Sequence, residues 1–272
     1  MSARLKISDG TWRLGKQPQN WLTARQATYL AAFFDDTCYK VSARLSRDPS
    51  VHEVTLTDDF ADEFRPDTDK HNRIMSALEA EDIHLELEVT RMTLPEETEV
   101  GADVGIVLDI RMNDLSLKKA ILLQAKKLAI RGNEPEYRDL LTRHARMQSK
   151  KMLAATPASF FMLYNPLPFE PANEGVNFIE FPEAHRTRVN LFPPEIRQGI
   201  MILPAITQQG LKVKPGFQTI SRFSLPFTNF MLDDFIQCKV GDGGSKAIRI
   251  ASSEEEKFPV RHTIKLVVYT AD

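Results

Sequence analysis

Two apolar segments separated by a polar turn constrain the fold of this chain more than any other feature. Residues 104–110 are almost entirely aliphatic and rich in valine and isoleucine, and residues 120–126 form a second apolar run. Asn113 and Asp114 between them are typical turn residues. Such runs bounded by turn residues predict two successive strands of one sheet.

Flanking segments extend this pattern to a mixed sheet. Residues 85–90 alternate aliphatic and polar side chains, which predicts a preceding strand, so that three strands form a meander. A helix is expected over residues 134–153 and a further strand over 159–164. A strand–helix–strand unit favours a right-handed crossover and parallel pairing. We therefore expect an α/β (α+β) protein with a mixed central sheet flanked by helices.

The remaining segments suggest three regions. Residues 1–69 are expected to be a helical extension, with a helix over 21–45 and an exposed acidic connection over 58–69. Residues 70–170 are expected to be the core, and a helix over 69–82 is expected at its start. Residues 171–272 are expected to be a strand-rich elaboration packed on the core. Its short apolar pieces are 176–179, 199–203, 248–250 and 264–269.

Composition excludes several classes of protein. Apolar residues at 42% and charged residues at 26% are typical of a globular chain and argue against disorder. The two cysteines show no CxxC spacing, which favours a reducing cytoplasm over secretion and gives no zinc motif. We find neither a signal-peptide pattern nor the roughly 20 apolar residues of a membrane span. We expect a cytoplasmic protein without a membrane partner.

Charge is distributed unevenly along the chain. The net charge of −2 argues against a protein that coats DNA. Residues 52–103 are nevertheless dominated by acids, whereas residues 118–151 are rich in lysine and arginine. A solvated helix face would give the same basic pattern. Because the basic run begins beside the polar residues described next, it favours a phosphate-binding surface.

Three polar residues lie where the predicted strands begin or end. Asp103 opens one strand after Gly101 and Ala102, and Gln124 and Lys126 share one face of the next strand because side chains alternate. One carboxylate, one amide oxygen and a lysine are suited to hold Mg²⁺ against a phosphodiester and to aim a water at it. A turn aspartate and an edge-strand lysine are the alternative interpretation.

Aspartate followed by Gln-x-Lys on an apolar strand resembles the PD-(D/E)xK nuclease superfamily. The likeness is closest to its QxK branch, the Mrr-like restriction endonucleases and related anti-phage effector nucleases. It covers about residues 70–165 and implies a restriction-endonuclease-like αβββαβ core. Two departures are the absence of proline before Asp103 and the neutral amide of Gln124, which removes a negative charge from the site.

The resemblance also implies roles for individual residues. Asp103, Gln124 and the carbonyl of Ala125 would bind Mg²⁺, or Mn²⁺ in its place, and Lys126 would be the catalytic lysine. An additional acid would come from Glu79, Glu97 or Glu99, of which we favour Glu97 as a catalytic residue. The residues expected to contact the DNA backbone are Lys127, Arg131, Arg138, Arg143 and Arg146.

The function expected from this resemblance is that of a Mg²⁺-dependent endonuclease acting on DNA in a bacterial restriction or anti-phage system. Cleavage of both strands predicts a homo-oligomer, and a regulatory or helicase subunit is a further expected partner. One alternative is a catalytically inactive nucleic-acid-binding or scaffolding subunit of a multi-protein defence complex. Another is a sensor whose C-terminal half binds a small ligand or partner.

Overall fold

The computed structural model describes most of the chain in eight stretches: residues 21–66, 69–92, 100–131, 134–137, 139–166, 199–211, 217–254 and 260–270. The helices are α1 (Ala24–Arg47), α2 (Glu53–Asp62), α3 (Asp69–Glu79), α4 (Arg143–Ala155), α6 (Ala205–Gly210), α7 (Phe217–Phe223), α8 (Phe227–Asn229), the π-helix η1 (Phe230–Ile236) and α9 (Ser245–Ala251). The strands are β1 (Ile83–Arg91), β2 (Val104–Met112), β3 (Leu115–Lys127), β4 (Ala129–Arg131), β5 (Glu134–Glu136), β6 (Ser159–Tyr164), β7 (Ile200–Pro204), β8 (Leu225–Pro226) and β9 (His262–Thr270).

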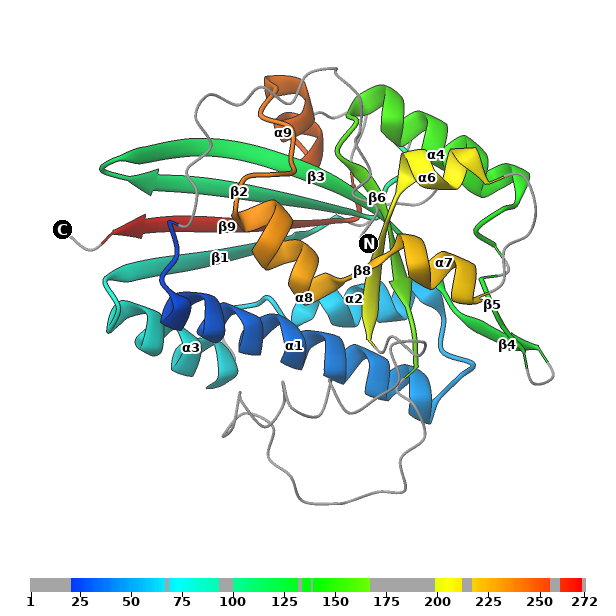
Figure 1. The fold of residues 1–272 in the computed structure, drawn as a ribbon, viewed down its shortest axis with the longest axis horizontal. Coiled ribbons are helices and arrows are strands. Elements are labelled where there is room, and N and C mark those ends of the chain that lie inside the picture. Colours follow the sequence, from blue (N-terminus) through cyan, green and yellow to red (C-terminus); the bar gives the residue numbers. More distant parts are fainter. Residues whose placement is uncertain are drawn as a thin grey trace.

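A seven-stranded mixed sheet with the order β1-β9-β2-β3-β6-β7-β8 forms the centre of the molecule. Helices α1, α2 and α3 cover one face, and α4, α6 and α9 cover the other (Figure 1). The expected mixed sheet flanked by helices is confirmed. Antiparallel pairing of β2 with β3 and parallel pairing of β3 with β6 also agree with the sequence pattern.

The expected meander is wrong in one respect, because β1 does not pair with β2. Strand β9, from the last residues of the chain, lies between them, antiparallel to β1 and parallel to β2. Both faces of β9 are largely buried, as are those of β2, so either strand can serve as a central neighbour. A segment expected to belong to the C-terminal elaboration therefore completes the central sheet.

Other local expectations also need correction. The segment expected to be an exposed connection contains the second half of α2. Leu56, Phe60 and, just after the helix, Phe64 are fully buried at a spacing of four residues, which packs this segment on the core. The helix expected over 134–153 begins only at Arg143, where the Thr142 side chain accepts a hydrogen bond from Ala145 N at 3.1 Å. Residues 248–250 are helical in α9 rather than a strand-like piece. Residues 176–179 lie outside the described residues.

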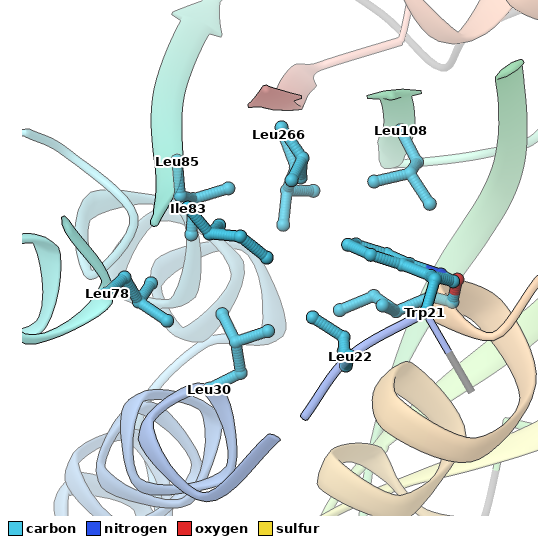
Figure 2. A pocket seen from close by; sticks show the side chains of 10 residues that line it. Trp21, Leu22, Leu30, Leu78, Ile83, Leu85, Leu108 and Leu266 are labelled. Atoms are coloured by element: carbon cyan, nitrogen blue, oxygen red, sulfur yellow. The ribbon is translucent and has the colours of Figure 1, made fainter. Parts of the chain in front are cut away.

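An apolar pocket lies in the core between the sheet and α1 (Figure 2). Trp21 and Leu22, which precede α1, face Leu108 and Leu266 of the central strands across it. All ten lining residues are hydrophobic, so the pocket has no group to bind a phosphate or a metal. In the described part of the chain, no helix is both long and apolar enough to cross a membrane.

Candidate active site

Asp103 lies immediately before β2, and its backbone joins the two neighbouring strands. Its N–H donates to the carbonyl of Leu123 and its carbonyl accepts from His262 N, each at 2.9 Å. Its carboxylate Oδ2 accepts from Ala125 N at 2.8 Å and from Gln124 Nε2 at 2.5 Å. Asp103 and Gln124, both predicted to belong to the site, are therefore in direct contact, and the Asp103 carboxylate is held in one orientation.

The electrostatic environment of Asp103 opposes its ionisation. Burial raises the pKa of this carboxyl from 3.8 to about 6. The N–H of Ala125 and the charge of Lys126 lower the pKa, while the nearby Glu53 carboxylate raises it further. Asp103 is thus an acid whose negative charge is costly in the protein alone and would be stabilised by a cation.

Gln124 and Lys126 are both buried near the end of β3, with exposed fractions of 3% and 6%. Between them, Ala125 packs into the core cluster that includes α1 and α2 residues, as expected from the alternation of side chains along a strand. The Lys126 Nζ lies 3.3 Å from Glu53 Oε1. Buried polar side chains at the end of an apolar strand are unusual unless they have partners, and both have them.

Glu53 is the residue of this site that the sequence interpretation missed. It begins α2, and its Oε2 accepts a hydrogen bond from Lys127 N at 2.9 Å while Oε1 faces Lys126. Burial raises its pKa, and the charge of Lys126 opposes that shift. The only sequence signal was an acid at the start of a helix, in a segment interpreted in part as a connection.

The glutamates considered from the sequence are placed differently. Glu79 lies 3.5 Å from His84 near the start of β1, whereas Asp103 is at the sheet end where β1 finishes, so Glu79 lies at the opposite end. Glu97 and Glu99 fall outside the described residues. Glu53 is therefore the acid that the structure brings to Lys126.

The basic residues proposed for DNA contacts have varied surroundings. Lys127 Nζ donates to the carbonyls of Pro49 and Val51, and Arg146 donates to the carbonyl of Leu211. Arg143 is exposed at the start of α4. The Arg131 side chain and the whole of Arg138 lie outside the described residues. Of the five, Arg143 is the described side chain most open to a ligand.

The oxygen donors of the site are suited to a hard divalent cation. They are the carboxylates of Asp103 and Glu53 and the carbonyl of Ala125, whereas the Gln124 amide presents its nitrogen to Asp103 and to Ala125. Within the described ranges, no three His, Cys, Asp or Glu side chains gather closely enough to hold a metal by themselves. Any ion here would therefore depend on the amide, a carbonyl, water or substrate as well as on the two acids.

Comparisons of the chain with models of protein families, with curated proteins and with solved structures gave no significant match.

Proposed function

We propose that this chain is a Mg²⁺-dependent endonuclease that hydrolyses phosphodiester bonds in DNA. The observation that carries the proposal is the convergence of Asp103, Gln124 and Lys126 at one sheet end, with Glu53 supplying a second acid. The pairing of β2, β3 and β6 supports a core like that of the PD-(D/E)xK nucleases. Insertion of β9 between β1 and β2 departs from a simple αβββαβ meander.

The donor set fits Mg²⁺, or Mn²⁺ in its place, on chemical grounds. Both ions prefer oxygen ligands. A divalent cation would offset the charge of the buried Asp103 carboxylate, while Glu53, whose pKa burial also raises, already faces Lys126. When bound, such an ion would lower the pKa of a ligated water and neutralise charge on the phosphoryl group. Asp103, Glu53 and the Ala125 carbonyl would hold it, and the Gln124 amide oxygen would join them once the amide, whose nitrogen donates to Asp103, has rotated.

The protein's own contribution is to position charge. Lys126 is fixed by Glu53, and its ammonium could orient a water and stabilise the negative charge that develops on a phosphate held at the site. The two hydrogen bonds to Asp103 keep its carboxylate oriented before substrate arrives. Such preorganisation reduces the reorganisation needed to reach the transition state.

The DNA substrate and the biological setting rest on charge and on the resemblance described above. The exposed Arg143 and the neighbouring Lys150 and Lys151 give α4 a basic surface without an acidic residue in the helix. A cytoplasmic restriction or anti-phage enzyme, acting as a homo-oligomer with a regulatory or helicase subunit, is the setting that we propose.

A plasmid-nicking assay with the purified chain tests the proposal. Supercoiled DNA is incubated with Mg²⁺, with Mn²⁺ and with EDTA, and single-stranded DNA and RNA are assayed in parallel. Lys126→Met is expected to reduce metal-dependent nicking by at least about 100-fold. Lys118→Met is the matched control, since Lys118 is an exposed lysine near the start of the same strand. Undiminished nicking by the Lys126 variant would exclude this mechanism.

A second candidate function is a nucleic-acid-binding or scaffolding subunit without catalytic activity. Two observations favour it: the Gln124 amide already donates to Asp103, and Lys126 is already paired with Glu53. Duplex binding in EDTA, together with an absence of cleavage under every metal tested, would support this function over the nuclease.

A further inference from the structure

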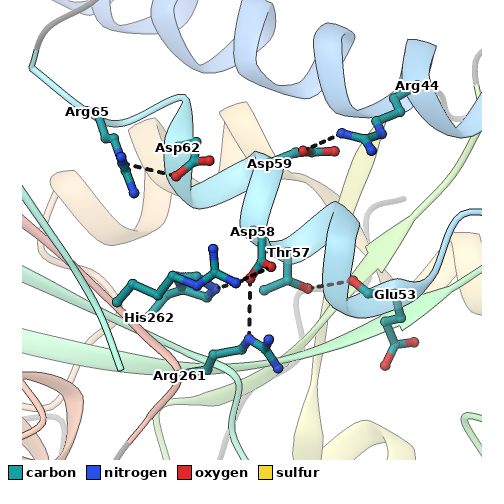
Figure 3. A network of polar contacts seen from close by, with 10 residues as sticks. Arg44, Glu53, Thr57, Asp58, Asp59, Asp62, Arg65, Arg261 and His262 are labelled. Carbon is teal, nitrogen blue, oxygen red and sulfur yellow. Dashed lines mark hydrogen bonds and ion pairs between the residues drawn. The ribbon is translucent and has the colours of Figure 1, made fainter. Parts of the chain in front are cut away.

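A second group of charged side chains lies at the same end of the sheet, centred on Asp58 of α2 (Figure 3). Asp58 Oδ1 lies 2.8 Å from His262 Nε2 and 3.3 Å from Arg261 Nε. Asp58 Oδ2 lies 2.7 Å from Arg91 Nη2. One carboxylate therefore faces two guanidinium groups and an imidazole.

The strand register places this group beside the candidate active site. Arg91 is the last residue of β1 and pairs with His262, the first residue of β9, which in turn pairs with Val104. Asp103 precedes Val104, and its carbonyl accepts from the His262 N–H at 2.9 Å. The charge of Arg261 is close enough to lower the pKa of Asp103. The arginines thus lie on the β1 and β9 side of the site, whereas Lys126 lies on the β3 side.

Both arginines retain capacity to bind a further anion. The Arg91 and Arg261 side chains are 46% and 29% exposed, whereas that of Asp58 is only 18% exposed. Each guanidinium has five N–H donors, and the contacts to Asp58 use one nitrogen of each. Guanidinium groups match the geometry of a phosphate, which can accept two hydrogen bonds from one arginine.

The charges in this group do not cancel. Burial lowers the pKa of His262, whose side chain is 1% exposed. Its Nδ1 has no hydrogen-bond partner among the described residues. Two positive arginines against one aspartate leave a net positive charge beside the acids of the active site. A structural ion pair would need only one arginine.

We propose that Arg91 and Arg261 form a subsite for a backbone phosphate of DNA next to the scissile position, and that Asp58 holds them in place until the phosphate binds. This inference rests on the proposed nucleic-acid substrate. Helix α2 then has two functions, because Glu53 pairs with Lys126 and Asp58 pairs with the arginines. Binding of DNA is expected to replace part of the Asp58 contact with phosphate contacts.

Fluorescence anisotropy with a labelled DNA duplex, in EDTA and over a series of salt concentrations, tests the subsite without requiring cleavage. Arg91→Ala and Arg261→Ala are each expected to weaken binding about fivefold or more and to reduce the salt dependence by about one phosphate contact. Asp58→Asn is expected to strengthen binding severalfold, because it removes the competing negative charge. Thermal unfolding of each variant identifies any that fail to fold.

Helix α2 also offers a matched control. Asp59 pairs with Arg44 of α1 at 2.6 Å on the side away from Asp58, and Arg44 has the same 46% exposure as Arg91 (Figure 3). Arg44→Ala and Asp59→Asn change the same charges and are expected to leave binding within about twofold of the unchanged protein. An equal loss in Arg44→Ala, or unchanged binding in both Arg91→Ala and Arg261→Ala, would overturn the subsite.

The outcomes separate this inference from the proposed nuclease. If the protein shows no cleavage and the arginine variants bind DNA more weakly, the subsite is supported and the nuclease function is excluded. If the protein shows metal-dependent cleavage and those variants bind DNA as the unchanged protein does, the subsite is excluded and the nuclease function is retained. If the folded protein binds no duplex, even at low salt, the subsite is excluded.

Discussion

The ammonium of Lys126 lies 3.3 Å from the carboxylate of Glu53, although the two residues are 73 positions apart in the sequence. The contact joins the end of β3 to the start of α2. Only 8% of the Lys126 side chain and 30% of the Glu53 side chain is exposed, so water screens the pair weakly. Its strength and its proposed role in catalysis can be measured separately.

Removing either partner of this pair is expected to destabilise the fold. Glu53→Gln and Lys126→Met should each lower the free energy of unfolding by about 1–3 kcal/mol, because the remaining charge is left partly buried without its partner. The double variant should lose less than the sum, with a coupling of about 1 kcal/mol in urea unfolding. The Arg25–Glu81 pair, with Arg25 77% exposed, is the control and should couple by less than about 0.5 kcal/mol. Equal coupling in both pairs would contradict this expectation.

The buried carboxyl of Asp103 is expected to make stability depend on pH. Its pKa is about 6 in the folded protein, against an ordinary aspartate value of 3.8, so the folded state binds the proton more tightly than the unfolded chain does. Its contribution to stability is therefore full below about pH 4 and is lost as pH rises to about 6, by at most about 3 kcal/mol. The Asp103→Asn variant has no carboxyl group to ionise here and therefore lacks this loss. The difference in the free energy of unfolding, variant minus unchanged protein, should therefore rise between about pH 4 and about pH 6.5.

Urea unfolding at several pH values measures this difference, and Asp114→Asn, in the exposed turn between β2 and β3, is the control. A stability difference for Asp103→Asn that stays constant over the range would show that burial does not shift the pKa. Nicking by the same variant should be absent, so one substitution is expected both to remove the pH-dependent loss of stability and to remove activity.

Gly105, in β2, is expected to tolerate no side chain. A Cβ at this position would lie 2.2 Å from the carbonyl oxygen of Ala251 and 2.6 Å from its Cα, both of which are backbone atoms of α9. Gly105→Ala should lower the free energy of unfolding by about 3 kcal/mol, because α9 must move away from the sheet. Gly210→Ala is the control, since a Cβ there meets no atom within 4 Å, and should be neutral or stabilising by up to about 1 kcal/mol. Similar thermal stabilities of the two variants would contradict the close approach.

A buried lysine outside the site predicts a second pH dependence. Lys119 donates to the carbonyls of Phe235 and Val240, and burial lowers its pKa to about 8 despite the nearby Cys238 and Asp234. The unfolded chain therefore binds the proton more tightly, and stability should rise with pH between about 8 and 10.5, by at most about 3 kcal/mol. Lys119→Met should lack this rise. Urea unfolding at about pH 7.5, 9 and 10, with Lys118→Met as control, tests it; parallel curves for all three proteins would contradict it.

Local sequence patterns predicted much of the fold because strand periodicity and helix capping depend on residues close together in the chain. The apolar runs of β2 and β3 and the alternation in β1 indicate strands whatever surrounds them, and Thr23 caps α1 together with Gln26 in a capping box. Helix α2 was missed because its acids, such as Asp58, Asp59 and Asp62, obscure the spacing of the buried Leu56 and Phe60. The charged residues of a helix can be read directly from the sequence, whereas the side of the helix that packs against the core cannot.

The sequence by itself determined that Asp103, Gln124 and Lys126 lie at strand ends, because strand periodicity and turn residues depend on neighbours in the chain. Only the tertiary structure decided which strands meet and which acid reaches the lysine. Strand β9 enters between β1 and β2, and α2 brings Glu53 to Lys126 and Asp58 to the arginines, through contacts between residues far apart in the sequence. Such contacts depend on burial and charge across the whole fold, which no local pattern records.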